Sequence, residues 1–77
     1  MTRKHYNELA ARFGTDLAAI GNVTKGERTA RSGYLDAIGA TVDALKSDNP
    51  RFDRDRFYSA VRMAEEKAIA KRFEVAS

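Results

Sequence analysis

Hydrophobic residues recur every three or four positions in three segments of this chain, the spacing that places side chains on one face of a helix. The first segment has them at Tyr6, Leu9, Ala10, Phe13, Leu17 and Ile20. The second has them at Tyr34, Leu35, Ile38, Val42 and Leu45. The third has them at Phe57, Val61, Ala64 and Ala68. No segment alternates with the period of a strand, so we predict an all-α fold: a small three-helix bundle with helices at about residues 3–20, 25–46 and 53–73, forming a single domain over 1–77.

The clearest helix start follows Pro50. A proline disfavours helical dihedral angles in the residue before it, so the second helix should end there. Asp53 can accept a hydrogen bond from a free backbone amide at the start of the third helix. Phe52 and Phe57 then have the spacing of a hydrophobic staple. We therefore expect these two rings to be in contact and to hold the start of the third helix against the bundle.

Glycines and threonines mark the other helix ends. Thr2 is a candidate N-cap for the first helix, and Gly21 can end that helix in a left-handed conformation. The second helix should start near Thr24 or Glu27. Gly14 lies inside the first helix, where glycine costs about 1 kcal/mol relative to alanine. We interpret Gly14 as the site of a kink or of close approach by a neighbouring helix.

The third helix carries a second apolar stripe. Tyr58, Ile69 and Phe73 lie roughly 100–140° around the helix from its main apolar face. A chain of 77 residues buries only about 60% of its unfolded surface, so one small core need not cover both faces. These three residues are therefore the candidate partner-binding residues. The alternative is that the thin core wraps around and covers them.

The charge is mildly basic, +3 from 14 basic and 11 acidic residues. The third helix holds six cations, Arg54, Arg56, Arg62, Lys67, Lys71 and Arg72. They lie on both flanks of the apolar stripe, with Asp55, Glu65 and Glu66 among them, whereas a DNA-reading helix needs one exposed face free of acids. We therefore expect only weak, salt-sensitive binding to nucleic acid through these residues. Glu27 and Arg31 have the spacing of a surface ion pair within the second helix.

Catalytic and metal-binding patterns are missing from the sequence. There is no cysteine, and His5 is the only histidine, which leaves little for a metal site or a histidine-based triad. Glu65 and Glu66 are adjacent, so they diverge by about 100° on a helix and do not form a catalytic carboxylate pair. We expect no enzyme activity, cofactor or metal. No apolar run approaches the ~20 residues of a membrane span, so we expect no membrane partner.

Two motifs carry a family resemblance. The start Met1-Thr2-Arg3-Lys4-His5-Tyr6 and the segment from Asn49 to Phe57 resemble those of short, uncharacterised proteins from mycobacteriophages and other actinobacterial phages. The resemblance implies a phage accessory protein in the bacterial host cytoplasm. Similar proteins tend to end soon after the equivalent of Phe57, so residues 63–77 depart from the pattern.

Together these observations predict a non-catalytic interaction protein that binds a host or phage protein or self-associates. A small nucleic-acid-binding regulator is the alternative.

Overall fold

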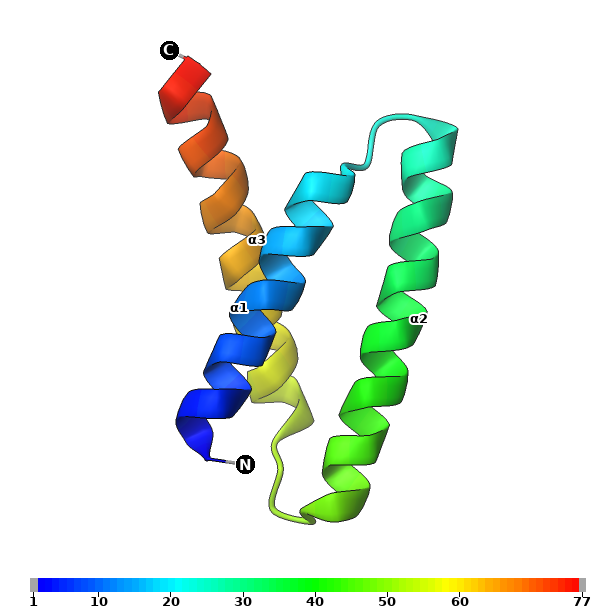
Figure 1. Ribbon diagram of the computed structural model, residues 1–77, viewed down its shortest axis with the longest axis vertical. Helices are drawn as coiled ribbons and strands as arrows, with labels where there is room; N and C mark the ends of the chain where they lie inside the picture. Colours follow the sequence, from blue (N-terminus) through cyan, green and yellow to red (C-terminus); the bar gives the residue numbers. More distant parts are fainter. Residues whose placement is uncertain (1, 77) are drawn as a thin grey trace.

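The computed structural model describes the backbone of residues 2–76 and the side chains of residues 2–72. It contains three helices, α1 (Arg3–Ile20), α2 (Lys25–Asp48) and α3 (Arg54–Ala76), and no strand among the described residues. α1 and α3 run in the same direction and cross, while α2 runs back along one side of the pair (Figure 1). The predicted all-α three-helix bundle is confirmed, with helix ends that differ from the prediction by at most three residues.

Capping boxes start the first two helices. The backbone N–H of His5 donates to Thr2 Oγ1 at 3.4 Å, and the Thr2 N–H donates to His5 Nδ1 at 3.4 Å. The N–H of Glu27 donates to Thr24 Oγ1 at 3.0 Å, and the Thr24 N–H donates to Glu27 Oε1 at 2.8 Å. Backbone bonds from Thr24 and then Val23 favour the ionised carboxylate, so the pKa of Glu27 is lowered. The predicted cap at Thr2 is therefore confirmed, with His5 completing it, and Thr24, one of the two predicted starts of the second helix, is its N-cap.

An aromatic clasp holds the start of α3. Asp53 Oδ1 accepts a hydrogen bond from the backbone N–H of Arg56 at 3.0 Å, as expected of an N-cap. The Phe52 and Phe57 rings lie 5.5 Å apart, and the Tyr6 ring of α1 lies 5.0 Å from Phe52. Phe52 and Phe57 are only 5% and 4% exposed. The predicted contact between these two rings is confirmed, and it attaches α3 to α1.

α1 and α3 are in direct backbone contact at their crossing. A Cβ built on Gly14 would overlap the carbonyl oxygen of Val61 and would lie 2.6 Å from the Cβ of Ala64. Ala10 and Ala18, one turn to either side of Gly14, are also buried. Only small side chains on this face let the two helices approach so closely. Gly14 therefore marks a close approach, one of its two predicted interpretations.

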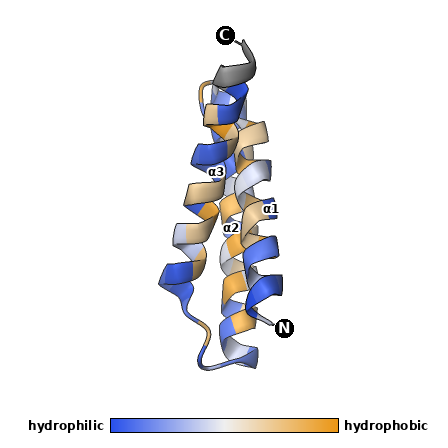
Figure 2. Ribbon diagram, turned by 90° about the vertical axis from the view of Figure 1, so that its left-hand side faces the viewer, coloured by the Kyte–Doolittle hydropathy of each residue, from blue (hydrophilic) through white to orange (hydrophobic). Residues whose placement is uncertain are grey.

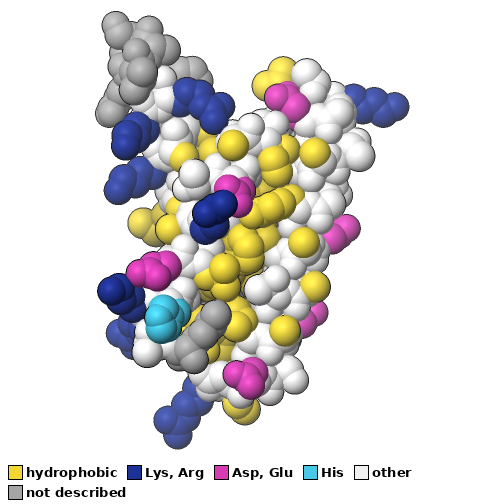
Figure 3. All heavy atoms as spheres, viewed as in Figure 1, with side chains coloured by type: hydrophobic (Ala, Val, Ile, Leu, Met, Phe, Trp, Pro, Cys, Tyr) yellow, Lys and Arg dark blue, Asp and Glu magenta, His cyan; other side chains and the backbone are white. Residues whose placement is uncertain are grey.

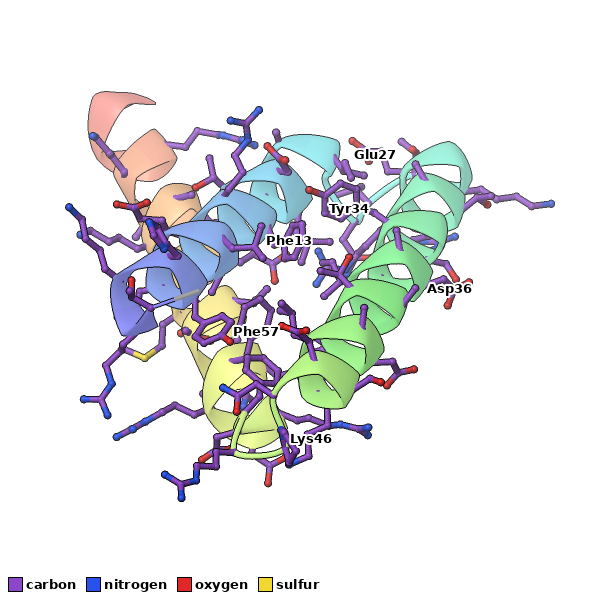
Figure 4. All side chains as sticks on the ribbon, turned by 60° about the horizontal axis from the view of Figure 1, so that its bottom comes forward. Phe13, Glu27, Tyr34, Asp36, Lys46 and Phe57 are labelled. Carbon is purple, nitrogen blue, oxygen red and sulfur yellow. The ribbon has the colours of Figure 1, made fainter. Side chains whose placement is uncertain are left out.

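α2 packs on this pair through larger side chains. The Phe13 ring lies edge-on to Tyr34 at 6.0 Å and to Phe57 at 6.1 Å, and all three rings point into the space that the helices enclose (Figure 4). Apolar positions of α2 lie behind α1 and α3 in the side view (Figure 2). The Cα positions span 43 × 25 × 15 Å, so the molecule is thin. The buried core consists of Ala10, Leu17, Ile38, Val42, Phe52, Phe57 and Val61.

An ion pair joins α2 to α3. Both terminal nitrogens of Arg31 donate to the carboxylate of Glu65, and the Nη2–Oε1 distance is 3.0 Å. The two side chains are 22% and 15% exposed. This hydrogen bonding raises the pKa of Arg31. The expected pair between Glu27 and Arg31 does not form, because Glu27 belongs to the capping box of α2.

Candidate functional site

Two residues of the apolar stripe predicted on α3 are partly exposed. Tyr58 is 41% exposed and Ile69 is 38% exposed. The Tyr58 hydroxyl oxygen lies 3.9 Å from the position that a Cβ of Gly39 would take, so this side chain points toward α2. Ile69 lies one helical turn beyond Glu65, on the same face of α3. Phe73, the third predicted residue, lies outside the described side chains.

Leu35 adds a residue that the sequence pattern had placed in the core. It lies one turn from Arg31 and one turn from Gly39 along α2, and both of these positions face α3. Leu35 nevertheless remains 41% exposed. Its exposure depends on the spacing of α2 from α3, which periodicity does not report. We call the exposed apolar set of Leu35, Tyr58 and Ile69 the α2–α3 seam.

The six cations of α3 do not act together. Arg54 pairs with Asp43 of α2 at 3.4 Å, and Arg72 donates to the carbonyl oxygen of Ala18 at 3.2 Å. Arg56 lines a hollow near the start of α3. The remaining three cations, all exposed, are Arg62, Lys67 and Lys71. Most of the Lys and Arg side chains visible in Figure 3 lie over α1 and α3, where acidic side chains also appear, and further acidic side chains follow the outer edge of α2.

The hollow that contains Arg56 lies between the first turns of α1 and α3 and the loop that joins α2 to α3. Its volume is about 280 Å³. Three arginines line it, against one carboxylate, that of Asp53. We call it the basic hollow; its lining residues are Arg3, Tyr6, Asn7, Ala10, Asn49, Arg51, Phe52, Asp53, Arg56, Phe57 and Ala60.

Hydrogen bonds fix the loop that forms one wall of the basic hollow. Lys46 Nζ donates to the carbonyl oxygens of Pro50 at 2.6 Å and of Phe52 at 3.1 Å. The side-chain oxygen of Asn49 accepts from the backbone N–H of Arg51 at 3.1 Å. The loop that carries Arg51 is thus tied to the end of α2.

The arginines of the basic hollow differ from most others in this chain. Among the described residues, the side chains of Arg3, Arg51 and Arg56 have no hydrogen-bond or ion-pair partner. By contrast, protein acceptors engage the side chains of Arg12, Arg28, Arg31, Arg54 and Arg72. Sequence analysis missed this site because Arg3 is separated from Arg51 by most of the chain. The sequence signals were Arg3 at the first helix start and the arginines around Pro50 and Asp53 at the third.

A second polar cluster connects α1 and α2. The Tyr34 hydroxyl donates to Asp16 Oδ2 at 2.7 Å, and Arg12 Nε donates to the same oxygen at 3.3 Å. Burial first, and then the bond to Asp16, raise the pKa of Tyr34 to about 12. A tyrosine that holds its proton so firmly is a poor general base or nucleophile near neutral pH. We therefore interpret this cluster as a structural link between the helices.

Within the described residues, no three His, Cys, Asp or Glu side chains lie close enough to hold a metal ion. None of the described helical stretches is both long and apolar enough to cross a bilayer. No protein-family model, curated protein or solved structure matches this chain.

Proposed function

We propose that this chain is a non-catalytic interaction protein that acts by covering a surface of another protein chain. In line with its resemblance to phage accessory proteins, its partner is a host or phage protein or a second copy of itself in the cytoplasm of a bacterial host. The proposal assigns no reaction, cofactor or metal to the chain.

The exposed α2–α3 seam is the observation that supports the proposal. Leu35, Tyr58 and Ile69 keep 38–41% of their surface exposed although the core has few large side chains of its own. Complete burial of a large apolar side chain contributes about 1.5–3 kcal/mol of free energy. Covering the exposed parts of the three seam side chains therefore contributes a fraction of that free energy for each. Aromatic residues are also common among the dominant contacts of protein interfaces. The seam is thus an apolar surface that a protein partner would gain free energy by covering.

The test compares glutamate substitutions in the seam with one outside it. If the wild-type protein is a dimer, Leu35→Glu and Ile69→Glu should abolish the dimer in light scattering. If it is a monomer, the same substitutions should abolish its cross-links to a partner protein when it is expressed in its host. Met63→Glu is the matched control, because Met63 is on α3 and is already 69% exposed. Circular dichroism establishes that each variant remains helical.

The outcomes separate the explanations. If the seam variants lose an association that the Met63 variant keeps, the seam is the interface. If wild-type protein neither self-associates nor cross-links to a protein, or if all three variants behave alike, the proposed function is wrong.

The nucleic-acid alternative has weaker support. Arg54 and Arg72 are engaged within the chain, which leaves Arg62, Lys67 and Lys71 as the exposed cations on the body of α3. So few cations release few counterions, and the affinity should disappear as salt is raised. Gel-shift titrations at low and physiological salt test this. Tight binding that depends on base sequence and survives physiological salt would favour the alternative.

A further inference from the structure

The basic hollow is separate from the α2–α3 seam, and the proposed function does not use it. It lies at the end of the molecule where α1 and α3 both begin, which comes forward in Figure 4. Ile69 of the seam lies nearly four helical turns beyond Arg56 along α3. Tyr58 of the seam directly follows Phe57 of the hollow, so the seam is tested separately through Leu35 and Ile69, which do not line the hollow.

Positive charge is concentrated in the basic hollow. Arg3 comes from α1, Arg51 from the loop and Arg56 from α3, so three separate elements each contribute one arginine to the lining. The one aspartate of the lining, Asp53, already accepts the backbone N–H of Arg56 as a helix cap. The N-terminal ends of two helices add partial positive charge at this end of the molecule. An anionic ligand is therefore favoured here.

The frame of the basic hollow is built before any ligand arrives. The Tyr6 ring packs against Phe52 at a centroid distance of 5.0 Å with the ring planes tilted by 54°, and Asn49 Nδ2 donates to the Tyr6 hydroxyl at 3.5 Å. The loop carbonyls of Pro50 and Phe52 are held by Lys46. On the side of this chain, only the arginine side chains have to be ordered on binding, which keeps the entropic cost of binding low.

We propose that the basic hollow binds an acidic peptide segment of a protein partner. Carboxylates of the segment pair with Arg3, Arg51 and Arg56, and a neighbouring apolar side chain enters the hollow beside Tyr6 and Ala60. Guanidinium groups bind carboxylates through two parallel hydrogen bonds, and groups on three elements suit carboxylates spaced along a peptide. A volume of about 280 Å³ lies just below the usual range for small-molecule pockets, roughly 300–1,000 Å³. It accommodates a side chain or two.

Nucleic acid fits the same hollow less well. Single-stranded nucleic acid binds through bases stacked on exposed aromatic rings. Here Phe52 and Phe57 are 5% and 4% exposed, so neither ring offers a face for stacking.

Fluorescence anisotropy with a labelled synthetic peptide tests the proposal. The probe is a short peptide in which pairs of aspartate or glutamate alternate with leucine. The test variant combines Arg51→Gln with Arg56→Gln. The control combines Arg62→Gln with Lys67→Gln, which removes the same charge from exposed positions of α3 outside the hollow. A thermal melt of each variant verifies its fold.

We expect saturable peptide binding by the wild type. The affinity for the peptide should fall by about tenfold or more in the hollow variant and by less than about twofold in the control. Leu35→Glu, which targets the seam, should leave peptide binding unchanged even if it abolishes self-association. The proposal fails if the wild type shows no saturable binding or if both double variants weaken it equally, since the latter is a net-charge effect. It also fails if a single-stranded thymidine oligonucleotide displaces the peptide more effectively than unlabelled peptide does.

Discussion

Substitution of Gly14 by alanine tests the close crossing of α1 and α3. In an exposed helix interior, alanine is more favourable than glycine by about 1 kcal/mol. At Gly14 the added methyl group would overlap the Val61 carbonyl oxygen and would lie 2.6 Å from Ala64 Cβ and 2.8 Å from the Glu65 backbone nitrogen. Two of these neighbours are backbone atoms, which no rotamer change can move. The helices must therefore separate by about 1 Å to restore normal contact distances.

The magnitude follows from these opposing effects. Overpacking of a well-packed core costs about 1–3 kcal/mol and occasionally more, and a collision with backbone belongs at the upper end. After subtraction of the gain in helix propensity, we expect Gly14→Ala to lower the free energy of unfolding by about 2 kcal/mol. A chain of 77 residues has a total of roughly 4–12 kcal/mol. The melting temperature should fall by about 10 °C, since 1 kcal/mol corresponds to about 4–8 °C at this size.

Gly33 provides the matched control. It also lies inside a helix, but no atom lies within 4 Å of the position of its added Cβ. Gly33→Ala should therefore stabilise the protein by about 1 kcal/mol. Urea unfolding followed by the helical circular dichroism signal measures both variants. If Gly14→Ala stabilises the protein as Gly33→Ala does, the close contact between α1 and α3 is wrong.

Three further experiments test the core and its polar links. Phe57→Ala should lower the free energy of unfolding by about 3–5 kcal/mol, because the ring is 4% exposed; an unchanged melting temperature would contradict this bundle. The pKa of Tyr34 is raised to about 12 from 10.0, so its contribution to stability is complete below pH 10 and is lost as the pH rises from 10 to 12. Tyr34→Phe should therefore lose less stability than the wild type over that range in urea unfolding, and equal losses would refute the link to Asp16. A double-mutant cycle of Arg31→Gln and Glu65→Gln should give a coupling of about 1–2 kcal/mol, above the 0–1 kcal/mol of exposed pairs; a coupling near zero would show that the pair adds nothing.

Local signals in the sequence determined the helices and most of their ends. Apolar residues spaced by three and four positions indicate one face of a single helix, whatever that helix packs against. A cap such as Thr24 with Glu27 involves residues only three apart. The contact of Phe52 with Phe57 was predictable for the same reason. These features depend on interactions along a few residues of chain, so the sequence reports them directly.

Local rules fail where one residue has competing partners. The spacing of Glu27 and Arg31 predicts an ion pair on α2, yet Glu27 binds backbone amides of its own cap and Arg31 reaches Glu65 on α3. Leu35 fits the apolar pattern of a core position but remains 41% exposed. In both cases the position of α3 relative to α2 decides the outcome.

The basic hollow depends on tertiary structure, and so does the exposure of Leu35 in the α2–α3 seam, whereas the sequence predicted Tyr58 and Ile69. Arg3 and Arg51 lie on one surface only because α1 and α3 start at the same end of the molecule and a tied loop connects α2 to α3. That arrangement depends on how closely the helices cross, which Gly14 permits and does not by itself impose. Helix formation is governed by neighbours in sequence, whereas the crossing of helices is governed by the fit of whole faces, so the sequence determined the elements and the packing decided the surfaces.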